Sequence, residues 1–284
     1  MVNLISLNNI TIVITTFRSH RTIFKCLESI PKKIKKIIVE NSQDKDLKLT
    51  LENKYKNLKC FLMPENFGYG KANNFGIVKT KTDYVFILNP DTILEPNFLI
   101  NFLSKLEFEQ FSIAAPLEKN DNSSYIFKKN GVLDVEYVKG FAMLLNKKKM
   151  FKTFFDENFF LYLEEIDLCK NIKNKNGRIL LVNVKIKHDG GNSHGNRDDF
   201  EMEKSRNWHW MWSKFYFTKK HNGYLFSFFK NLTTLLLGFL KYIFYTLTNN
   251  RKKKYIYLMR TSGLINSYLL RKSYYRPYKK NKFF

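Results

Sequence analysis

The sequence predicts an α/β protein: a mostly parallel, Rossmann-like sheet flanked by helices, followed by a basic, amphipathic helical C-terminal extension. Four short runs rich in β-branched and aromatic residues alternate with helical stretches between residues 10 and 88, as in a parallel sheet. Because these runs are almost continuously apolar, we expect strands that are covered on both faces. Of the 284 residues, 44% are hydrophobic, which supports a buried core and excludes a disordered chain.

The apolar runs and the helix signals place the elements in order along the chain. Strands are expected at Ile10–Thr16, Ile34–Glu40, Lys59–Met63, Tyr84–Leu88, Gly140–Leu145, Arg178–Val182 and Lys185–His188. Helices are expected at Thr22–Ser29, Lys48–Tyr55, Gly70–Lys79, Glu95–Glu107 and Glu164–Lys175. Pro96 suits the first turn of the fourth helix, and Gly177 is a candidate C-cap of the fifth.

The net charge of the chain is +24, and it is distributed unevenly. Residues 201–284 hold 18 Lys and Arg against two acidic residues, Glu201 and Glu203, so this part alone carries +16. Such an excess favours an anionic partner: nucleic acid, a membrane surface or a phosphorylated substrate. We therefore divide the chain into a globular domain at 1–204 and a basic tail at 205–284.

Apolar residues recur at three- and four-residue spacing over residues 225–247, the pattern of one helical stripe. Lys230 and Lys241 leave only ten uncharged residues between them, short of the roughly 20 that span a bilayer. Because the basic run Arg251–Lys254 follows directly, residues 224–254 are expected to lie on an anionic membrane surface. The alternative is a helix whose stripe packs on the main domain.

The three cysteines, Cys26, Cys60 and Cys169, form no CxxC pair and no disulfide framework. We therefore expect three buried thiols in a reducing compartment. The N-terminal stretch has no early positive charge and no small-residue cleavage site, so no signal peptide is expected. Together with the basic tail, these features predict a cytoplasmic protein that is peripheral at the inner face of the cell membrane.

Polar side chains follow the ends of the first four expected strands, where open parallel sheets bind their ligands. They are Thr16, Arg18, Glu40, Asn66, Asn89 and Asp91. The stretch at 66–76 is rich in glycine, although its spacing matches neither a Walker loop nor a dinucleotide fingerprint. Gly68 and Gly70 allow close backbone approach, and the helix N-terminus that follows, with Lys71, favours a phosphate.

Asp91 and four further residues are candidates for catalysis or metal binding. Asp91 ends an apolar strand, where a carboxylate suits a hard cation such as Mg²⁺ or Mn²⁺. His188 could add a nitrogen ligand, although most single histidines bind no metal, and zinc is not expected because no Cys/His cluster exists. Glu164, Glu165 and Asp167 open a helix after an aromatic run. Such acids either stabilise the positive helix end or act as a base, and their spacing leaves both interpretations open.

Taken in order, these stretches resemble the motifs of the inverting family 2 glycosyltransferases with the GT-A fold, a group that includes bacterial rhamnosyltransferases. The matching stretches are I-V-I-T-T-F-R-S at 12–19, N-F-G-Y-G-K-A-N-N-F-G at 66–76, L-N-P-D at 88–91, G-F-A-M at 140–143, F-L-Y-L-E-E-I-D-L at 160–168, and 184–193 with His188 and Ser193. The resemblance covers Ile10–Ser193. It implies a nucleotide-sugar transferase that inverts the anomeric centre.

The resemblance also implies a role for each candidate residue. The nucleotide pocket would be lined by Thr16, Glu40, Asn66, Lys71 and Asn74. Asp91 would hold a divalent metal, Mg²⁺ or Mn²⁺, on the diphosphate, with His188 as a further ligand. Glu165 stands where the family has its general base, and Glu164 and Asp167 are its rivals. The implied donor is a UDP- or dTDP-sugar, and the implied acceptor is a glycan or a lipid-linked molecule used in polysaccharide biosynthesis.

Three positions depart from the family pattern: Arg18 replaces an Asn, and Glu40 and Glu165 each replace an Asp. Arg18 either reaches the diphosphate or faces solvent. A catalytically inactive, GT-A-like binding protein is therefore one alternative. Another is a nucleic-acid-binding protein that grips phosphates and stacks bases through the basic, aromatic run at 271–278. Because the RNP and zinc-finger signatures are absent, we expect no nucleic-acid partner.

Overall fold

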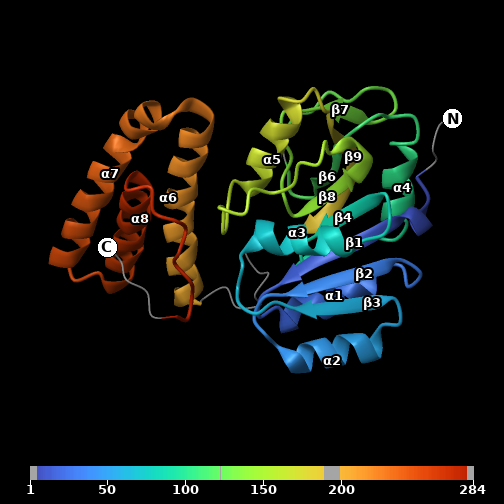
Figure 1. The fold of residues 1–284 in the computed structure, drawn as a ribbon, viewed down its shortest axis with the longest axis horizontal. Coiled ribbons are helices and arrows are strands. Elements are labelled where there is room, and N and C mark those ends of the chain that lie inside the picture. Colours follow the sequence, from blue (N-terminus) through green and yellow to red (C-terminus); the bar gives the residue numbers. More distant parts are fainter. Residues whose placement is uncertain (1–4, 122, 189–198, 280–284) are drawn as a thin grey trace. The chain divides into compact units, whose positions relative to one another are not determined.

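Residues 5–121, 123–188 and 199–279 are described by a computed structural model of the chain. The chain divides into two compact units, Met1–Asp156 with Glu165–Arg197 and Glu157–Glu164 with Asp198–Phe284. The charge pattern led us to expect one boundary at 204/205, whereas this division lies at 197/198 and also gives residues 157–164 to the second unit. Each unit is described by itself, and Figure 1 labels the elements of both.

A sheet of nine strands, counted over the described residues, forms the centre of the first unit. Its strands are β1 (Ile10–Thr16), β2 (Lys35–Glu40), β3 (Leu58–Leu62), β4 (Tyr84–Leu88), β5 (Thr92–Ile93), β6 (Ile113–Glu118), β7 (Val132–Asp134), β8 (Ala142–Asn146) and β9 (Ile179–His188). Their order is β3-β2-β1-β4-β8-β6-β9-β5, with β7 also paired to β9. The four strands from β3 to β4 are parallel, and β8 lies antiparallel between β4 and β6. The predicted α/β sheet is therefore confirmed.

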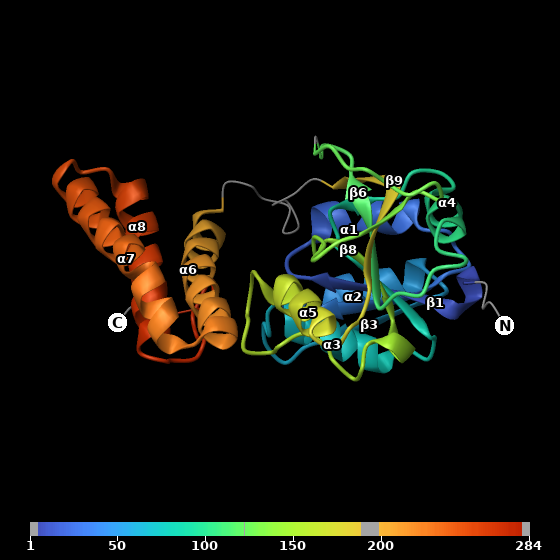
Figure 2. The same ribbon diagram turned by 90° about the horizontal axis from the view of Figure 1, so that it is seen from above.

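Helices cover both faces of this sheet. They are α1 (His20–Ser29), α2 (Lys45–Lys54), α3 (Tyr69–Lys79), α4 (Phe98–Ser104) and α5 (Glu164–Lys173). Because successive strand residues point to opposite faces, Ile12 and Ile14 join the hydrophobic cluster that includes Phe102 of α4, whereas Val13 joins the one that includes Ile172 of α5. Figure 2 shows α1 and α3 on opposite sides of the sheet. The three cysteines are buried in these clusters, as predicted.

The predicted boundaries hold for β1 and β4 and differ elsewhere for local reasons. The helix expected at Glu95–Glu107 was placed too early, because Asn97 has a left-handed backbone (φ 61°) and α4 begins only at Phe98. The strands expected at Arg178–Val182 and Lys185–His188 are one strand, β9, because a bulge in its pairing with β6 carries it across the residues between them. The sequence pattern did not indicate β5, β6 or β7.

Gly76 lets α3 lie close against the sheet. A Cβ at this position would come within 2.4 Å of Val13 Cγ1 and 3.1 Å of Val39 Cγ2. Since both valines belong to the packed core, only a residue without a side chain fits between the helix and the strands. The last glycine of the 66–76 stretch therefore serves helix packing.

Three helices make up most of the second unit: α6 (Phe200–Asn222), α7 (Tyr224–Leu247) and α8 (Arg251–Tyr268). A Cβ at Gly263 of α8 would lie 2.2 Å from the carbonyl oxygen of Trp208, so α6 and α8 are in close contact. Trp208 also donates from Nε1 to Ser262 Oγ at 3.1 Å. The predicted helical extension is confirmed. None of the described helices combines the length and the hydropathy that crossing a membrane requires.

The segment after α8 folds back onto α6 at His209. The buried imidazole bonds to Ser273 Oγ through Nδ1 at 3.0 Å and to the Tyr275 carbonyl oxygen through Nε2 at 2.9 Å. Burial lowers the pKa of His209 well below its usual value, so the ring is neutral and donates to the carbonyl. Phe160 stacks on the same ring, with centroids 4.4 Å apart. The tyrosine at 275, which could have stacked on a nucleic-acid base, lies instead in the core of this unit.

Replacing Gly76 by alanine is expected to lower the free energy of unfolding by about 1–3 kcal/mol, because the added methyl group overlaps the Val13 side chain. Urea unfolding followed by circular dichroism measures the change. In the double variant Gly76→Ala/Val13→Ala, the loss of unfolding free energy should be smaller than the sum of the losses in the two single variants, since Val13→Ala removes the methyl groups that the new side chain overlaps. Full additivity would contradict this packing argument.

Candidate functional site

The carboxyl ends of β1, β2 and β4 meet at one edge of the sheet. Thr16 is the register partner of Glu40, and the Asn41 amide donates to the Thr16 carbonyl oxygen at 2.9 Å. On the other side of β1, β4 leads into Asn89, whose amide donates to the carbonyl oxygen of Phe141 at 2.8 Å. The structure therefore brings candidate residues from separate strands to a common edge, where ligands of parallel sheets bind.

Glu40 organises the loop that follows β2. Its buried carboxylate accepts bonds from the Ser42 amide at 3.0 and 2.8 Å, from the Ser42 hydroxyl and from the Asp44 amide at 3.3 Å. Burial raises the pKa of Glu40 even though the bonds from Ser42 oppose the shift. The Ser42 hydroxyl in turn accepts from the backbone amide of Arg18, whose side chain is exposed. Glu40 thus positions Ser42, and Ser42 in turn holds the backbone of Arg18.

The glycine-rich stretch begins α3 at the same edge. Gly68 has a left-handed φ of 82°, and its amide donates to Asn66 Oδ1 at 3.0 Å. Asn41 Nδ2 donates to the Gly68 carbonyl oxygen at 3.1 Å, which ties this turn to the end of β2. Gly70 is buried in the first turn, and Lys71 Nζ lies 4.4 Å from the centre of the Phe67 ring. The turn and the helix N-terminus are therefore rigidly placed.

Side-chain amides on α3, buried at Asn73 and half-buried at Asn74, hold the helix to its neighbours. Asn73 accepts a bond from the Thr15 hydroxyl at 3.1 Å. Asn74, a candidate for nucleotide binding, donates to the Phe155 carbonyl oxygen at 2.9 Å and accepts from its amide at 3.1 Å. Asn41 belongs to the polar residues expected at the end of the second strand, whereas Asn73 was not selected from the sequence because its only signal was its position within the glycine-rich stretch.

Asp91 and His188 lie together although they are far apart in the sequence. The antiparallel pairing of β5 with β9 makes Thr92 the register partner of His188, and His188 Nε2 lies 3.4 Å from Asp91 Oδ1. Its Nδ1 lies 3.3 Å from Glu118 Oε1 at the end of β6. Burial lowers the pKa of His188, but the two carboxylates, Asp91 foremost, outweigh it and raise the pKa above its usual value. Glu118 was missed because nothing in its local sequence marks it.

The donor atoms at this place suit a hard divalent cation. Buried Thr16 Oγ1 and Asn89 Oδ1 make no hydrogen bond within the part of the chain that the structure describes, and His188 Nε2 faces only the Asp91 carboxylate at 3.4 Å. No group of three or more His, Cys, Asp or Glu among the described residues is arranged to hold a metal ion. A cation held by Asp91 and His188 would therefore take few protein ligands, as Mg²⁺ does where phosphates and water complete its shell. Ser193 and its neighbouring glycines lie outside the described residues.

Glu165 is connected to this pair through the segment before β8. A Cβ at Gly140 would lie 3.2 Å from Glu165 Cβ, so the backbone and the carboxylate stem are in contact. The next residue, Phe141, stacks on the His188 ring with centroids 4.2 Å apart and planes 5° from parallel. Tyr69 donates from its hydroxyl to the Gly140 carbonyl oxygen at 2.6 Å, which fixes the segment to α3. Burial raises the pKa of Glu165.

The other two acids of α5 have different surroundings. Asp167 is fully buried and accepts a bond from Asn171 Nδ2 at 2.9 Å, one helical turn on. Glu164 is the first residue of α5 and falls within the second unit. Glu165 is therefore the acid of this helix that lies against the Gly140 segment.

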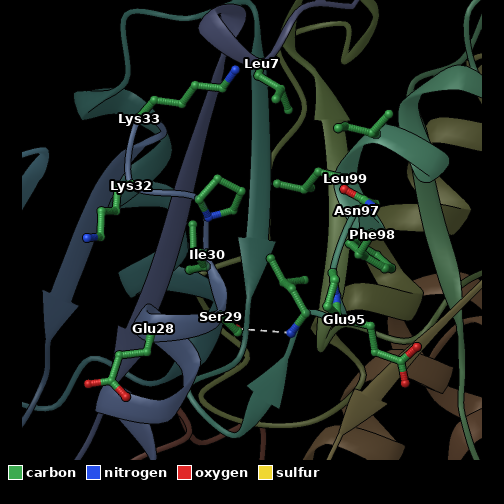
Figure 3. A pocket seen from close by; sticks show the side chains of 14 residues that line it. Leu7, Glu28, Ser29, Ile30, Lys32, Lys33, Glu95, Asn97, Phe98 and Leu99 are labelled. Carbon is green, nitrogen blue, oxygen red and sulfur yellow. Dashed lines mark hydrogen bonds between the residues drawn. The ribbon is translucent and has the colours of Figure 1, made fainter.

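A pocket of about 330 Å³ lies at the other end of the strands. Leu7 and Lys33, which line it, precede β1 and β2, and Figure 3 shows them with the start of α4. The Leu94 amide donates to Ser29 Oγ at 3.1 Å at its border. Because it opens at the amino ends of the strands, this pocket is separate from the edge that holds Asp91 and Glu40.

Comparison with known proteins places the chain among relatives. The model described as "Glycosyl transferase family 2" matches residues 11–168. The chain is similar to rhamnosyltransferase WbbL of Escherichia coli (strain K12), at 24% identity over 172 residues, which are 47% of this chain and 64% of that protein. It is also similar to the uncharacterized glycosyltransferase RT0329 of Rickettsia typhi, at 34% identity over 92 residues, 31% of this chain and 29% of that one. The matched stretch thus spans less than two thirds of either relative.

Solved structures with the same fold include S. aureus TarS 1–349, with a TM-score of 0.52 and 13% identity over 94% of this chain and 93% of that one. The same protein in complex with UDP gives a TM-score of 0.51 over the same coverage. GalNAc-T7 with UDP, GalNAc and Mn²⁺ gives 0.50 at 13% identity, over 63% of this chain and 43% of that one. At these identities the likeness concerns the fold, and the predicted GT-A fold is confirmed.

In metal-free protein, Glu118→Gln is expected to lower the pKa of His188, because one of the two carboxylates that raise it is removed. Asp91→Asn should lower the pKa of His188 by more than Glu118→Gln does, since Asp91 contributes more to raising it. The His188 ring signals in NMR spectra recorded against pH measure both shifts. Asp83→Asn, at the opposite end of β4, is the matched control, and a wild-type titration in Glu118→Gln would contradict the contact.

Proposed function

Because the chain belongs to glycosyl transferase family 2, we propose that it transfers a sugar from a nucleotide diphosphate to an acceptor hydroxyl group with inversion at the anomeric carbon. The proposed donor is a UDP- or dTDP-sugar, and the proposed acceptor is a glycan or lipid-linked molecule of polysaccharide biosynthesis. The name of the E. coli relative, a rhamnosyltransferase, and the UDP in two structures of the same fold support this proposal.

The observation that carries the proposal is a continuous set of contacts within the first unit. It runs from Asp91 to His188, through the stacked ring of Phe141 to Gly140, and from there to Glu165. Asp91, whose carboxylate would bind the cation, and Glu165, whose carboxylate would accept the proton, are thus connected through the backbone segment Gly140–Phe141. Single-displacement transfer requires two such groups on a common site.

Asp91 and His188 would hold Mg²⁺ or Mn²⁺, and the cation would supply positive charge to the departing diphosphate. Mn²⁺ accompanies UDP in GalNAc-T7, a protein of the same fold. Glu118, bonded to Nδ1 of His188, keeps Nε2 directed at Asp91.

Glu165 would take the proton of the acceptor hydroxyl group. The hydroxyl oxygen forms a bond to the anomeric carbon while the bond from that carbon to the diphosphate breaks, so the configuration inverts in one step. Burial raises the pKa of Glu165, and a carboxylate with a raised pKa is a stronger base at neutral pH. Asp167 is less suited because it already bonds to Asn171.

The residues proposed to bind the nucleotide-sugar donor differ in the hydrogen bonds that their side chains already form within the protein. Thr16 and Asn89 have buried oxygens without a hydrogen bond among the described residues, which supports a role in binding the nucleotide. Gly70 and Lys71 at the start of α3 would meet the phosphates. Glu40, Asn66 and Asn74 would act through the backbone that they hold in place, whereas the exposed side chain of Arg18 would reach the diphosphate. Of these, Asn74 would have to release Phe155 to contact a ligand directly.

Metal-dependent nucleotide binding is the first expected result. Titration calorimetry with UDP, dTDP, GDP and CDP should give Mn²⁺-dependent heat for one of them, and Asp91→Asn should abolish it because the cation loses its carboxylate. Asp83→Asn, the same substitution at the other end of β4, should leave binding unchanged. If no nucleotide binds at millimolar concentration, the donor proposal fails.

Glu165→Gln is expected to keep nucleotide binding and to slow transfer by about 10²–10⁴-fold, the contribution of a general base. Product formation from the donor identified by calorimetry measures the rate. The matched variant Glu164→Gln should change the rate little. Wild-type transfer by Glu165→Gln would overturn the base assignment, and nucleotide binding without transfer by the wild type would favour the inactive, binding-only alternative.

A further inference from the structure

The two residues of α7 that are fully buried are polar, whereas most of its large apolar residues are exposed. Its polar residues Ser227 and Asn231 are fully buried against the rest of the second unit. Ser227 donates from Oγ to the Phe215 carbonyl oxygen at 3.0 Å, and Asn231 donates from Nδ2 to the Ser227 carbonyl oxygen at 2.9 Å. Tyr268 of α8 donates to the carbonyl oxygen of Phe228 at 2.7 Å. The inner face of α7 is therefore held to α6 and α8 by the bonds of Ser227 and Tyr268 and by Leu235, which packs on the buried cluster of Met211, Phe215 and Leu264.

The outer face is apolar and exposed. Figure 1 shows α7 with α8 and α6 along one side of it. Ten large apolar side chains project from the opposite side: Leu225, Phe226, Phe229, Leu236, Leu237, Phe239, Leu240, Ile243, Phe244 and Leu247. The exposed fraction is 68% at Phe229 and 81% at Leu247. An apolar strip of this length, about 36 Å for 24 residues, indicates an interaction surface.

The groups that border this strip are mostly basic, and Glu203 of α6, which pairs with Lys252 at 3.1 Å, neutralises one of them. Lys230 and Lys241 are eleven residues apart in α7, so they lie on the same flank of the helix. The run Arg251–Lys254 opens α8, where four cations meet the positive end of the helix dipole at an energetic cost that an external anion would remove. The sequence contains no carboxylate side chain after Glu203.

We propose that the outer face of α7 docks in the interface of a lipid bilayer rich in anionic lipids, with the bordering lysines and the start of α8 against the headgroups. The apolar strip supplies buried area and the basic border supplies attraction to anionic lipid, the two features of helices that lie in a membrane plane. Since α7 is not apolar enough to cross a membrane, it lies on the surface.

A second copy of this chain fits the surface less well. Two copies that shared the apolar strip would bring their basic borders together, and neither copy offers an acidic group from α7 or α8 to neutralise them. Anionic headgroups supply the complementary charge. The proposal does not depend on the sugar transfer proposed above, because it concerns only the second unit.

Flotation of the full chain with vesicles tests the apolar strip. The wild type should bind vesicles of phosphatidylcholine with phosphatidylglycerol, and Phe229→Ser/Leu240→Ser should bind them at least about ten-fold more weakly, since two large apolar side chains no longer insert. Phe108→Ser/Ile126→Ser replaces two exposed apolar residues of the first unit and is the matched control. Nucleotide calorimetry on the same variants keeps this test separate from the proposed function.

The basic border has its own test. Lys230→Gln/Lys241→Gln should weaken binding to the anionic vesicles several-fold, and added salt should weaken binding of the wild type, because the attraction is electrostatic. Lys32→Gln/Lys33→Gln removes two exposed lysines from the first unit and should have little effect. Equal binding of the wild type to vesicles of phosphatidylcholine alone would overturn the anionic requirement.

A fluorescent label reports on the same surface without disturbing folding. The three native cysteines are buried, so Leu240→Cys carries the label alone, and its emission should shift to the blue on anionic vesicles whereas a label at Ile126→Cys should not shift. The proposal is overturned if the wild type does not float, or if Phe229→Ser/Leu240→Ser binds like the wild type. It is also overturned if sedimentation shows a lipid-free dimer that the same double variant converts to a monomer, because a second copy then covers the strip.

Discussion

The pairing of two-residue β5 with the end of β9 is the constraint on which the candidate site depends. It makes Thr92 the partner of His188 and so brings the carboxylate of residue 91 within 3.4 Å of an imidazole almost a hundred residues later. Phe141 then stacks on that ring and the adjacent Gly140 lies against Glu165. Because each contact positions the next, a change in the β5–β9 register would displace the whole set, since a one-residue slip turns every side chain to the opposite face.

The side-chain amides of three asparagines also hold the candidate site together. Asn41, Asn73 and Asn74 bond to the glycine-rich turn, to β1 and to the backbone of Phe155. Such bonds add modest stability individually, but a buried amide that lost its partner would cost more than the bond contributes. They therefore hold the N-terminus of α3 in one position, where its backbone amides are directed at the edge of the sheet. The same residues that resemble a binding motif are thus also structural.

The second unit has a buried apolar interior but also exposes an apolar face on α7. Its interior is held by aromatic stacking and by hydrogen bonds from Trp208, His209 and Ser227, and this leaves the apolar residues of α7 outside. The inner face of α7 combines these hydrogen bonds with the packing of Leu235 on the cluster of Met211, Phe215 and Leu264, so the apolar strip on the outer face is not needed to hold the helix in place. A surface-bound chain would find lipid-linked acceptors in two dimensions, which links the two proposals chemically.

Local signals in the sequence, apolar runs and helical spacing, were enough to predict the mostly parallel sheet, the positions of its first strands along the chain and the helical tail. The sequence also marked Asp91, His188 and Glu165 through motif resemblance. Tertiary structure alone decided that Glu118 bonds to His188, that Asn74 is engaged with Phe155 and that α7 turns its apolar face outward. These features arise from pairings between distant strands or helices, and hydrophobic spacing states only that a helix has an apolar face, never which neighbour will cover it.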